Sequence, residues 1–340
     1  MSHKASYPLR FEPICQYRLW GGHRLADILG TPLPNDGPFG EAWLLSDRDD
    51  HASVVADGPL KGQTLPQLMV HSRVELMGAI AQRFPRFPLL LKFLDARQML
   101  SVQVHPGYTD SGRLPADPQA KTEAWVVLEA APRSRIYAGL KPGSTVEAVR
   151  VAVAEGSLPA LLNPISPKVG DAIFIPAGTV HSLGDDVVVF EIQQNRDTTF
   201  RLYDWDHVDS NTGKPRELQI EQALACIDVT SKGAGLIHPT IETGTSPTRE
   251  MLFDCEFFKL ERFCGSLPFK VGEPGMPRVL VCVDGAGQIE CEGLAYAICK
   301  GEVWLLPAAV GTLAFQPHPA VTLLEASIPL PPYSSTERML

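Results

Sequence analysis

A short segment of the chain alternates polar and apolar residues and includes side chains that bind metal ions in many proteins. In Leu100–Pro106 the polar residues Ser101, Gln103 and His105 occupy every second position. Successive side chains of a β-strand point to opposite faces, so these three would share one face. The simpler interpretation is a strand with one solvent-exposed face, and this segment alone favours it. The functional interpretation is a barrel strand whose polar face lines a ligand cavity.

Two further segments add a carboxylate and a second imidazole. Lys121 and Glu123 open another strand-like segment and lie on one of its faces. His181 follows the turn at Pro176–Gly178, which would hold the ring rigidly. Each residue alone would more often have a structural role, but the combined nitrogen and oxygen set suits Zn²⁺, and Mn²⁺, Fe²⁺ or Co²⁺ would also accept it. The four candidate metal ligands are Gln103, His105, Glu123 and His181.

The elements that must position these residues are mostly strands. The chain has 28 Gly and 30 Pro dispersed along 340 residues, which is typical of many short strands joined by turns. Helical patterns occur at 63–84, 145–162 and 217–227. The other periodic segments form two strand-rich blocks separated by the Gly-containing segment 232–235. We therefore expect a mainly β protein with two small barrels or jelly rolls and a few helices.

One nine-residue pattern occurs twice. Residues 169–177 and 300–308 both contain glycine, an acidic residue, an apolar run and then Pro-Ala, and they align without a gap at an offset of 131 residues. Such a repeat indicates a duplicated barrel. At the same offset His181 corresponds to Thr312, so the second copy lacks this candidate ligand.

A second candidate ligand is also replaced. In a less secure alignment Glu123 falls near Arg278, which cannot bind a metal ion. We expect a catalytic domain at 1–231, with a helical insertion near 145–162, and a degenerate C-terminal β domain at 236–340 without metal ligands.

Composition and charge exclude several classes of function. The formal net charge of −9 argues against a nucleic-acid partner, which would require a basic face. The sequence contains no run of about 20 apolar residues that would span a membrane, and its first residues do not resemble a signal peptide. The seven cysteines include no C-x-x-C motif and are interpreted as reduced thiols of a cytoplasmic protein.

Together these segments resemble the type I mannose-6-phosphate isomerases, particularly the short bacterial form. The resemblance runs in family order across roughly residues 11–207, and the C-terminal third matches only in general character. It departs from the family pattern at Gly107–Tyr108 and at Gln119–Ala120, which leaves the exact sugar open. The matching segments are Trp20–Gly22, Gly40–Trp43, Leu91–Leu94, Leu100–Pro106, Lys121–Trp125, Ile136–Leu140, Pro176–Leu183 and Asp197–Trp205.

The resemblance implies a cupin fold, one Zn²⁺ per chain held by the four candidate ligands, and interconversion of mannose 6-phosphate and fructose 6-phosphate. It also places Lys92, Lys121 and Arg201 in the active site. Lys121, two residues from Glu123, is a candidate acid or base for proton transfer between sugar carbons C1 and C2, and a phosphate or hydroxyl contact is its alternative role.

Other roles remain open at this stage. Arg201 could stabilise the enediolate or bind phosphate, or it could form a rim ion pair with Asp204 or Asp197. Phosphate binding is the first expectation for Lys92. Ser101 and Trp20 are candidate sugar contacts, although a tryptophan more often packs in a core.

Two alternatives compete with the isomerase hypothesis. One is a non-catalytic cupin that senses a sugar or sugar phosphate, and the other is an isomerase or epimerase of a related aldose. The complete set of ligands and cationic side chains favours the enzyme. The sequence predicts neither the oligomeric state nor a function for the C-terminal domain.

Overall fold

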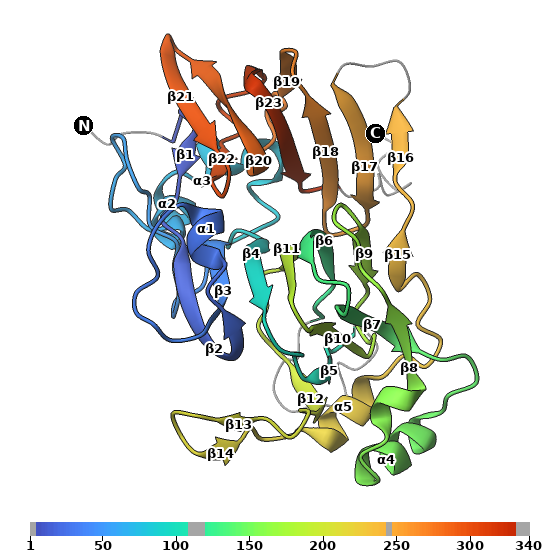
Figure 1. Ribbon diagram of the computed structural model, residues 1–340. Coiled ribbons are helices and arrows are strands. Elements are labelled where there is room, and N and C mark those ends of the chain that lie inside the picture. Colours follow the sequence, from blue (N-terminus) through green and yellow to red (C-terminus); the bar gives the residue numbers. More distant parts are fainter. Residues whose placement is uncertain (1–4, 108–119, 243–246, 331–340) are drawn as a thin grey trace. The chain divides into compact units, whose positions relative to one another are not determined.

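The computed structural model describes residues 5–107, 120–242 and 247–330, and most of its regular elements are strands (Figure 1). The predicted mainly β class is therefore confirmed. The strands belong to open sheets, and no hydrogen-bonded ladder among the described residues closes into a complete barrel. Tyr108 and Gln119, at the two departures from the family pattern, lie outside these ranges.

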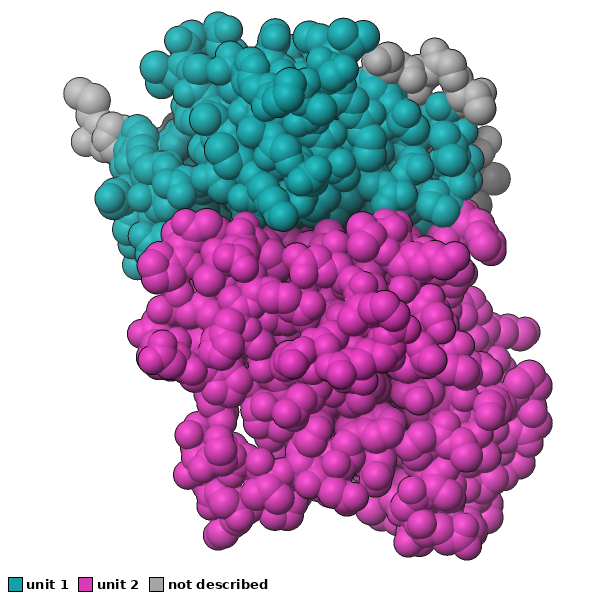
Figure 2. All heavy atoms as spheres, in the orientation of Figure 1, with its two compact units in different colours: residues 1–12, 47–88, 239–340 teal, residues 13–46, 89–238 magenta. Residues whose placement is uncertain are grey.

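The chain divides into two compact units, coloured separately in Figure 2. Unit 1 comprises residues 1–12, 47–88 and 239–340, and unit 2 comprises residues 13–46 and 89–238. These units describe which residues lie in contact and do not show which segments fold independently. The domains expected from the sequence, at 1–231 and 236–340, therefore stay a prediction.

Unit 2 contains two larger sheets, and their facing strands carry the candidate ligands. Their cores are built from buried Val, Ile, Leu and Trp side chains, residue types that favour strands. The seven-stranded sheet comprises β15 (Gly235–Ile237), β9 (Ala172–Ile175), β6 (Glu123–Ala130), β11 (Val187–Gln194), β4 (Leu89–Ala96), β2 (Ile14–Gly22) and β3 (Phe39–Leu45). The five-stranded sheet comprises β12 (Phe200–Tyr203), β5 (Val102–Val104), β10 (His181–Gly184), β7 (Arg135–Leu140) and β8 (Leu162–Ile165).

The helices of unit 2 are short. The predicted helical segment 145–162 contains α4 (Val146–Ala154) followed by a 3₁₀ turn, η3 (Leu158–Leu161). Thr145 caps α4 by accepting a hydrogen bond from the backbone N–H of Ala148. The remaining helices are α1 (Leu25–Leu29) and α5 (Ile220–Cys226), and a small hairpin is formed by β13 (Val208–Asp209) and β14 (Lys214–Pro215).

Unit 1 is built on a nine-stranded sheet. Its central path comprises β1 (Leu9–Arg10), β22 (Val303–Leu306), β20 (Arg278–Cys291), β23 (Leu313–Ser327), β18 (Lys259–Gly265), β17 (Thr248–Asp254) and β16 (Thr240–Glu242), with β19 (Phe269–Val271) and β21 (Leu294–Cys299) attached. The single helix predicted at 63–84 is instead three pieces, because Ser72 adopts a non-helical conformation after the first. These are α2 (Leu65–His71), α3 (Arg73–Met77) and the 3₁₀ helix η1 (Gly78–Ile80).

The strand registers show that the two main sheets repeat one pattern. Glu123 in β6 pairs with Ile175, and Arg278 in β20 pairs with Leu306. Residues 175 and 306 differ by 306 − 175 = 131, the offset of the sequence repeat. The path β15-β9-β6-β11-β4 therefore corresponds to β1-β22-β20-β23-β18. This correspondence confirms the duplication and aligns Glu123 with Arg278.

Among the described residues, no helix combines the length and apolar character that a membrane crossing requires.

Candidate metal centre and substrate cavity

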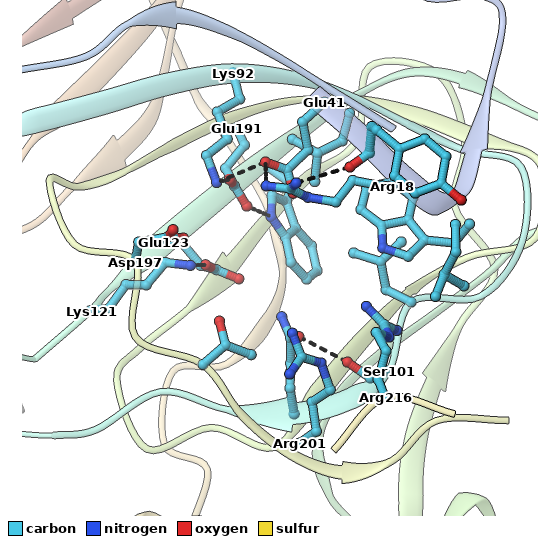
Figure 3. A pocket seen from close by; sticks show the side chains of 18 of the residues that line it. Arg18, Glu41, Lys92, Ser101, Lys121, Glu123, Glu191, Asp197, Arg201 and Arg216 are labelled. Atoms are coloured by element: carbon cyan, nitrogen blue, oxygen red, sulfur yellow. Dashed lines mark hydrogen bonds and ion pairs between the residues drawn. The ribbon is translucent and has the colours of Figure 1, made fainter. Parts of the chain in front are cut away.

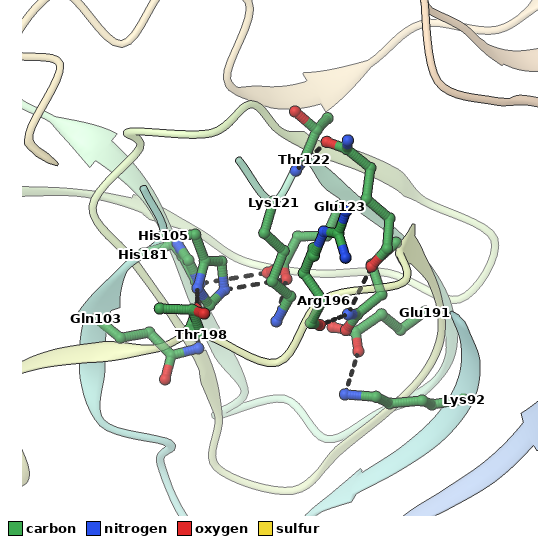
Figure 4. Close-up of polar contacts among 12 residues, drawn as sticks. Lys92, Gln103, His105, Lys121, Thr122, Glu123, His181, Glu191, Arg196 and Thr198 are labelled. Atoms are coloured by element: carbon green, nitrogen blue, oxygen red, sulfur yellow. Dashed lines mark hydrogen bonds and ion pairs between the residues drawn. The ribbon is translucent and has the colours of Figure 1, made fainter. Parts of the chain in front are cut away.

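The candidate ligands meet where three strands of unit 2 begin or end. Gln103 lies in β5, and His105 follows that strand directly. Glu123 is the first residue of β6, and His181 is the first residue of β10, where it pairs in register with Gln103. Figure 4 shows these side chains converging from the two sheets. The tight turn before His181 and the alternation in β5 direct the side chains toward one point.

The two imidazoles flank one carboxylate in a buried cluster. His105 Nε2 lies 3.1 Å from Glu123 Oε2, and His181 Nε2 lies 3.2 Å from Glu123 Oε1. Each of the three residues is only 1% exposed. Their potential ligand atoms all lie within 4.8 Å of one another, so the cluster has the composition and spacing to hold a metal ion.

Backbone contacts fix which imidazole nitrogens are available. His105 Nδ1 lies 2.8 Å from the carbonyl oxygen of Thr198, and His181 Nδ1 lies 2.8 Å from that of Thr179. Because a carbonyl oxygen only accepts hydrogen bonds, each Nδ1 carries the proton and each Nε2 keeps a lone pair.

The Nε2 atoms of both histidines lie beside the carboxylate of Glu123, which is also an acceptor. Both carboxylate oxygens of Glu123 and Nε2 of His105 are buried without a hydrogen-bond partner, and the carboxylate has one ion pair with a lysine, from Lys121 Nζ to Oε2 at 3.2 Å. Buried acceptors that face one another are stabilised by a cation between them. The donor set therefore fits a divalent transition metal on chemical grounds.

Burial and neighbouring charges keep the cluster in the protonation state that metal binding requires. Burial, helped by the positive charge of Lys121, lowers the pKa of His105 to about 4. Burial also lowers the pKa of His181. Burial opposes ionisation of Glu123, but Lys121 and the two histidines outweigh it and hold the pKa of this carboxyl well below its usual value. Neutral imidazoles and an ionised carboxylate are the metal-binding forms.

Gln103 sits beside this cluster in a definite orientation. Its Nε2 lies 3.2 Å from His181 Nε2, and its Oε1 accepts a hydrogen bond of 3.2 Å from the Ser101 hydroxyl. A half-turn of the amide would exchange the two atoms and present Oε1 to the cluster instead. The Ser101 hydroxyl can donate to Oε1 or accept from Nε2, so it supports either orientation of the fourth candidate ligand.

A cavity of about 420 Å³ opens beside the cluster (Figure 3). Its lining includes Gln103, Glu123 and Lys121, together with the predicted sugar contacts Ser101 and Trp20. Trp20 is only 2% exposed and also packs in the core of unit 2, as most tryptophans do, and its contact with a sugar stays a prediction. This volume lies in the range typical of small-ligand sites.

Lys92 is buried at the wall of this cavity between two carboxylates. Its Nζ lies 3.2 Å from Glu191 Oε2 and 3.6 Å from Glu41 Oε2, and it lies over the ring of Trp43. Burial by itself would lower the pKa of Lys92, but Glu41 and Glu191 raise it above the ordinary lysine value. The charge of Lys92 is therefore already matched within the protein, which weakens the expectation that it binds phosphate.

Arg201 is arranged differently. Asp204, considered from the sequence as its partner, instead forms a bidentate ion pair with Arg216. No carboxylate among the described residues lies within ion-pair distance of Arg201, and its Nε is buried without a hydrogen-bond partner. Burial and the nearby Arg216 lower the pKa of Arg201. An anion in the cavity would satisfy this guanidinium.

Sequence reasoning did not assign several charged residues that line the cavity. Glu41 lies in a segment quoted for the family resemblance, and Glu191 is an acidic residue inside an apolar strand, a pattern that signals a buried partner. Asp197 opens another quoted segment and was considered only as a partner of Arg201, whereas Arg18 and Arg216 carry no comparable local signal. The charged cavity-lining residues to which the sequence assigned no site role are Arg18, Glu41, Glu191, Asp197, Asp209 and Arg216.

Comparison with known proteins gives consistent similarities. A family model described as the catalytic domain of type I phosphomannose isomerase matches residues 9–124. The chain is 35% identical over 308 residues to the mannose-6-phosphate isomerase ManA of Bacillus subtilis, covering 89% of this chain and 94% of that protein. It is 33% identical over 317 residues to a mannose-6-phosphate isomerase of Streptococcus mutans, covering 91% and 95% of the two chains. The crystal structure of a Bacillus subtilis mannose 6-phosphate isomerase matches with a TM-score of 0.86 at 30% identity, covering 94% of this chain and 99% of that one.

Proposed function

The chain belongs to the type I phosphomannose isomerase family, and we propose that it interconverts mannose 6-phosphate and fructose 6-phosphate in the cavity of unit 2. The observation that carries this proposal is the buried His105–Glu123–His181 cluster, whose ligand atoms lie close enough together to hold a metal ion and which adjoins a cavity lined by Lys121 and Arg201. A carbohydrate sensor would need neither a metal centre nor an acid–base group beside it.

The cluster would hold one Zn²⁺ per chain. His105 and His181 would bind through Nε2 and Glu123 through its carboxylate, with Gln103 as a fourth ligand after its amide turns. When bound, the metal would supply Lewis acidity that stabilises negative charge developing on the sugar oxygens. The mixed nitrogen and oxygen donors also accept Mn²⁺, Fe²⁺ or Co²⁺.

Lys121 is the group best placed to move the proton between C1 and C2. Its Nζ lies 3.2 Å from Glu123 Oε2, and it lines the cavity. A lysine held beside the metal centre would meet the reacting end of a bound sugar. From aldose to ketose, Lys121 in its uncharged form would take the proton from C2 and return it to C1, while the hydroxyl proton on O2 passes to O1 through the enediolate.

The phosphate group would sit against Arg201. This guanidinium has no carboxylate partner among the described residues, and its planar fork can bind two phosphate oxygens. Lys92 would then position Glu41 and Glu191 in the cavity wall. This role replaces the phosphate contact that was expected for Lys92 from the sequence. Ser101 and Trp20, which also line the cavity, would contact the sugar.

We also propose a cytoplasmic location. All seven cysteines are free thiols, the state expected in a reducing compartment, and none lies among the proposed active-site residues.

A substrate panel tests the proposed activity. Purified protein should convert mannose 6-phosphate to fructose 6-phosphate, followed by NMR of the sugar carbons, and it should act poorly on unphosphorylated mannose. Faster turnover of another phosphorylated aldose would instead favour the related-aldose alternative. Saturable binding of mannose 6-phosphate without turnover of any sugar in the panel would favour the sensor.

A further inference from the structure

Unit 1 contains a second cavity, independent of the metal centre. Its volume is about 480 Å³, and every lining residue belongs to unit 1. The lining comes from strands β1, β21 and β22, from Glu302 just before β22, and from Tyr7 and residues 57–59. The activity proposed above uses none of these residues.

Aromatic side chains line this cavity. Tyr296 and Trp304 meet edge to face with their ring centroids 5.8 Å apart, and Tyr7 is a third aromatic residue in the lining. Trp304 is buried, whereas Tyr296 remains partly exposed. Trp304 therefore supports Tyr296, whose ring is accessible to a ligand.

Polar groups with unused hydrogen-bonding capacity surround the rings. The Tyr7 hydroxyl accepts a hydrogen bond of 2.8 Å from the backbone N–H of Leu60, so its own proton remains free to donate. Burial raises the pKa of both Tyr7 and Tyr296, which keeps both phenols protonated as donors. Glu302 Oε2 accepts hydrogen bonds from the backbone N–H of Cys299 and from Trp304 Nε1–H, whereas among the described residues Oε1 has only a distant ion pair with Arg10, at 3.7 Å.

The charge of this cavity differs from that of the cavity in unit 2. Arg10 pairs with Asp57 at 2.7 Å and more distantly with Glu302, so one cation faces two carboxylates and the sum is 1 − 2 = −1. These side chains are between 27% and 45% exposed, so solvent and ligand can reach them. A net negative lining disfavours a phosphorylated ligand.

We propose that this cavity binds a neutral pyranose sugar. The apolar face of the ring would stack on Tyr296, while Asp57 and Glu302 accept hydrogen bonds from sugar hydroxyls. Arg10 and Tyr7 would donate to sugar oxygens. The ring could come from a free monosaccharide or from the end of an oligosaccharide, since both present the same chemistry.

Two non-isomerisable probes test this site. Methyl α-D-mannopyranoside and a methyl glycoside of mannobiose lack a free anomeric carbon, so neither can open to an aldehyde. Saturation-transfer NMR on the full-length protein would measure the dissociation constant of each. The mannobiose glycoside should bind more tightly if the site recognises a chain end, and the two should bind equally if it recognises a single ring.

Variants separate the two cavities. Tyr296→Ser should raise the dissociation constant at least about tenfold, equivalent to about 1.4 kcal/mol, while kcat/KM for mannose 6-phosphate stays unchanged. Leu267→Ser, at an exposed position elsewhere in unit 1, is the matched control and should change neither quantity. Lys121→Ala should leave binding of the probes intact.

Two results would overturn the proposal. One is the absence of saturable binding of either probe at millimolar concentrations. The other is binding that survives Tyr296→Ser but disappears in Lys121→Ala, which would place the sugar in the cavity of unit 2.

Discussion

The seven-stranded sheet of unit 2 and the nine-stranded sheet of unit 1 share a strand order but differ in the chemistry at equivalent positions. In unit 2, Glu123 points its carboxylate at two imidazoles. In unit 1, the equivalent residue is Arg278, which pairs with Glu325 at 3.3 Å and also with Glu273. A guanidinium thus occupies the strand position that carries a carboxylate in the other sheet.

The registers extend this correspondence to a second acidic residue. Glu191 on β11 pairs in register with Trp125, which lies two residues after Glu123 on β6. Glu325 on β23 pairs with Leu280, which lies two residues after Arg278 on β20. Glu191 and Glu325 are therefore equivalent. The carboxylate is kept in both sheets, but its cation is Lys92 on β4 in unit 2 and Arg278 on β20 in unit 1.

This difference gives the two sheets different capacities to hold a metal ion. In unit 2 the cation for Glu191 comes from a flanking strand. Glu123 there forms an ion pair with Lys121 at 3.2 Å, and Nε2 of His105 keeps a lone pair without a hydrogen-bond partner. In unit 1 Arg278 supplies the positive charge itself, and Thr312, which replaces His181 in the repeat, only donates a 3.5 Å hydrogen bond to the carbonyl oxygen of Gly272. A closed set of protein charges leaves nothing for a metal ion to satisfy.

The largest expected effect comes from breaking the cluster in unit 2. His181→Ala removes one imidazole, and we expect loss of the bound metal and a fall in kcat of about 10³-fold or more, because metal-based charge stabilisation is worth several kcal/mol. Thr312→Ala, at the equivalent position of unit 1, is the matched control and should leave both metal content and kcat unchanged. Retention of metal and activity in His181→Ala would refute the ligand assignment.

The next effect concerns stability in unit 1. Arg278→Met leaves the buried Glu325 without its cation and should lower the free energy of unfolding by about 3 kcal/mol, measured by urea denaturation. The double variant Arg278→Met/Glu325→Met should recover most of that loss, because it removes the unpaired charge. Metal content should not change in either variant, and a loss of metal would contradict the separation of the two clusters.

A smaller effect is expected at the anion-binding end of the cavity in unit 2. Arg201→Lys keeps the charge but loses the planar fork, so kcat/KM for mannose 6-phosphate should fall by about 10- to 100-fold. Arg133→Lys, the same replacement at an exposed position, is the matched control and should leave kcat/KM unchanged. If Arg201→Lys weakened turnover of unphosphorylated mannose by the same factor, Arg201 would act on the sugar carbons instead of on phosphate.

The smallest effect is a pH dependence of stability. Burial would raise the pKa of Glu41, but Lys92 and Arg18 outweigh it and hold the pKa below its ordinary value of 4.5. The stabilisation from this group is therefore complete above pH 4.5 and is lost as the pH falls, because the unfolded chain then binds a proton that the folded chain does not.

Replacement of Glu41 isolates this contribution. Glu41→Gln should reduce the slope of unfolding free energy against pH below pH 4.5 by up to about 1.4 kcal/mol per pH unit. Glu155→Gln removes an exposed carboxylate and should preserve the slope. Equal slopes for wild type and Glu41→Gln would show that Glu41 has its ordinary pKa in the folded protein.

Local patterns in the sequence predicted much of the fold but not the pairing of charges. Alternation in Leu100–Pro106 and the turn before His181 place side chains through the period of a strand, so their convergence was accessible from the sequence. The helix predicted at 63–84 was wrong in its continuity, because the break at Ser72 has no glycine or proline signal.

Contacts between distant strands could not be predicted in this way. The position of Lys92 between Glu41 and Glu191 depends on the registers of three strands, and Asp204 pairs with Arg216 because a hairpin brings the arginine back. The same limit applies to residues 47–88, which join unit 1 although they lie between two segments of unit 2. The assignments of metal ligands and catalytic residues stay predictions.

The most direct measurement counts the metal in purified protein and follows turnover of mannose 6-phosphate before and after chelation. The account predicts about one metal ion per chain, loss of turnover on chelation and recovery of turnover with Zn²⁺. No residue of unit 1 should be needed to bind this metal ion. Full turnover by metal-free protein would contradict the central claim that the buried histidine and glutamate cluster of unit 2 is a catalytic metal centre.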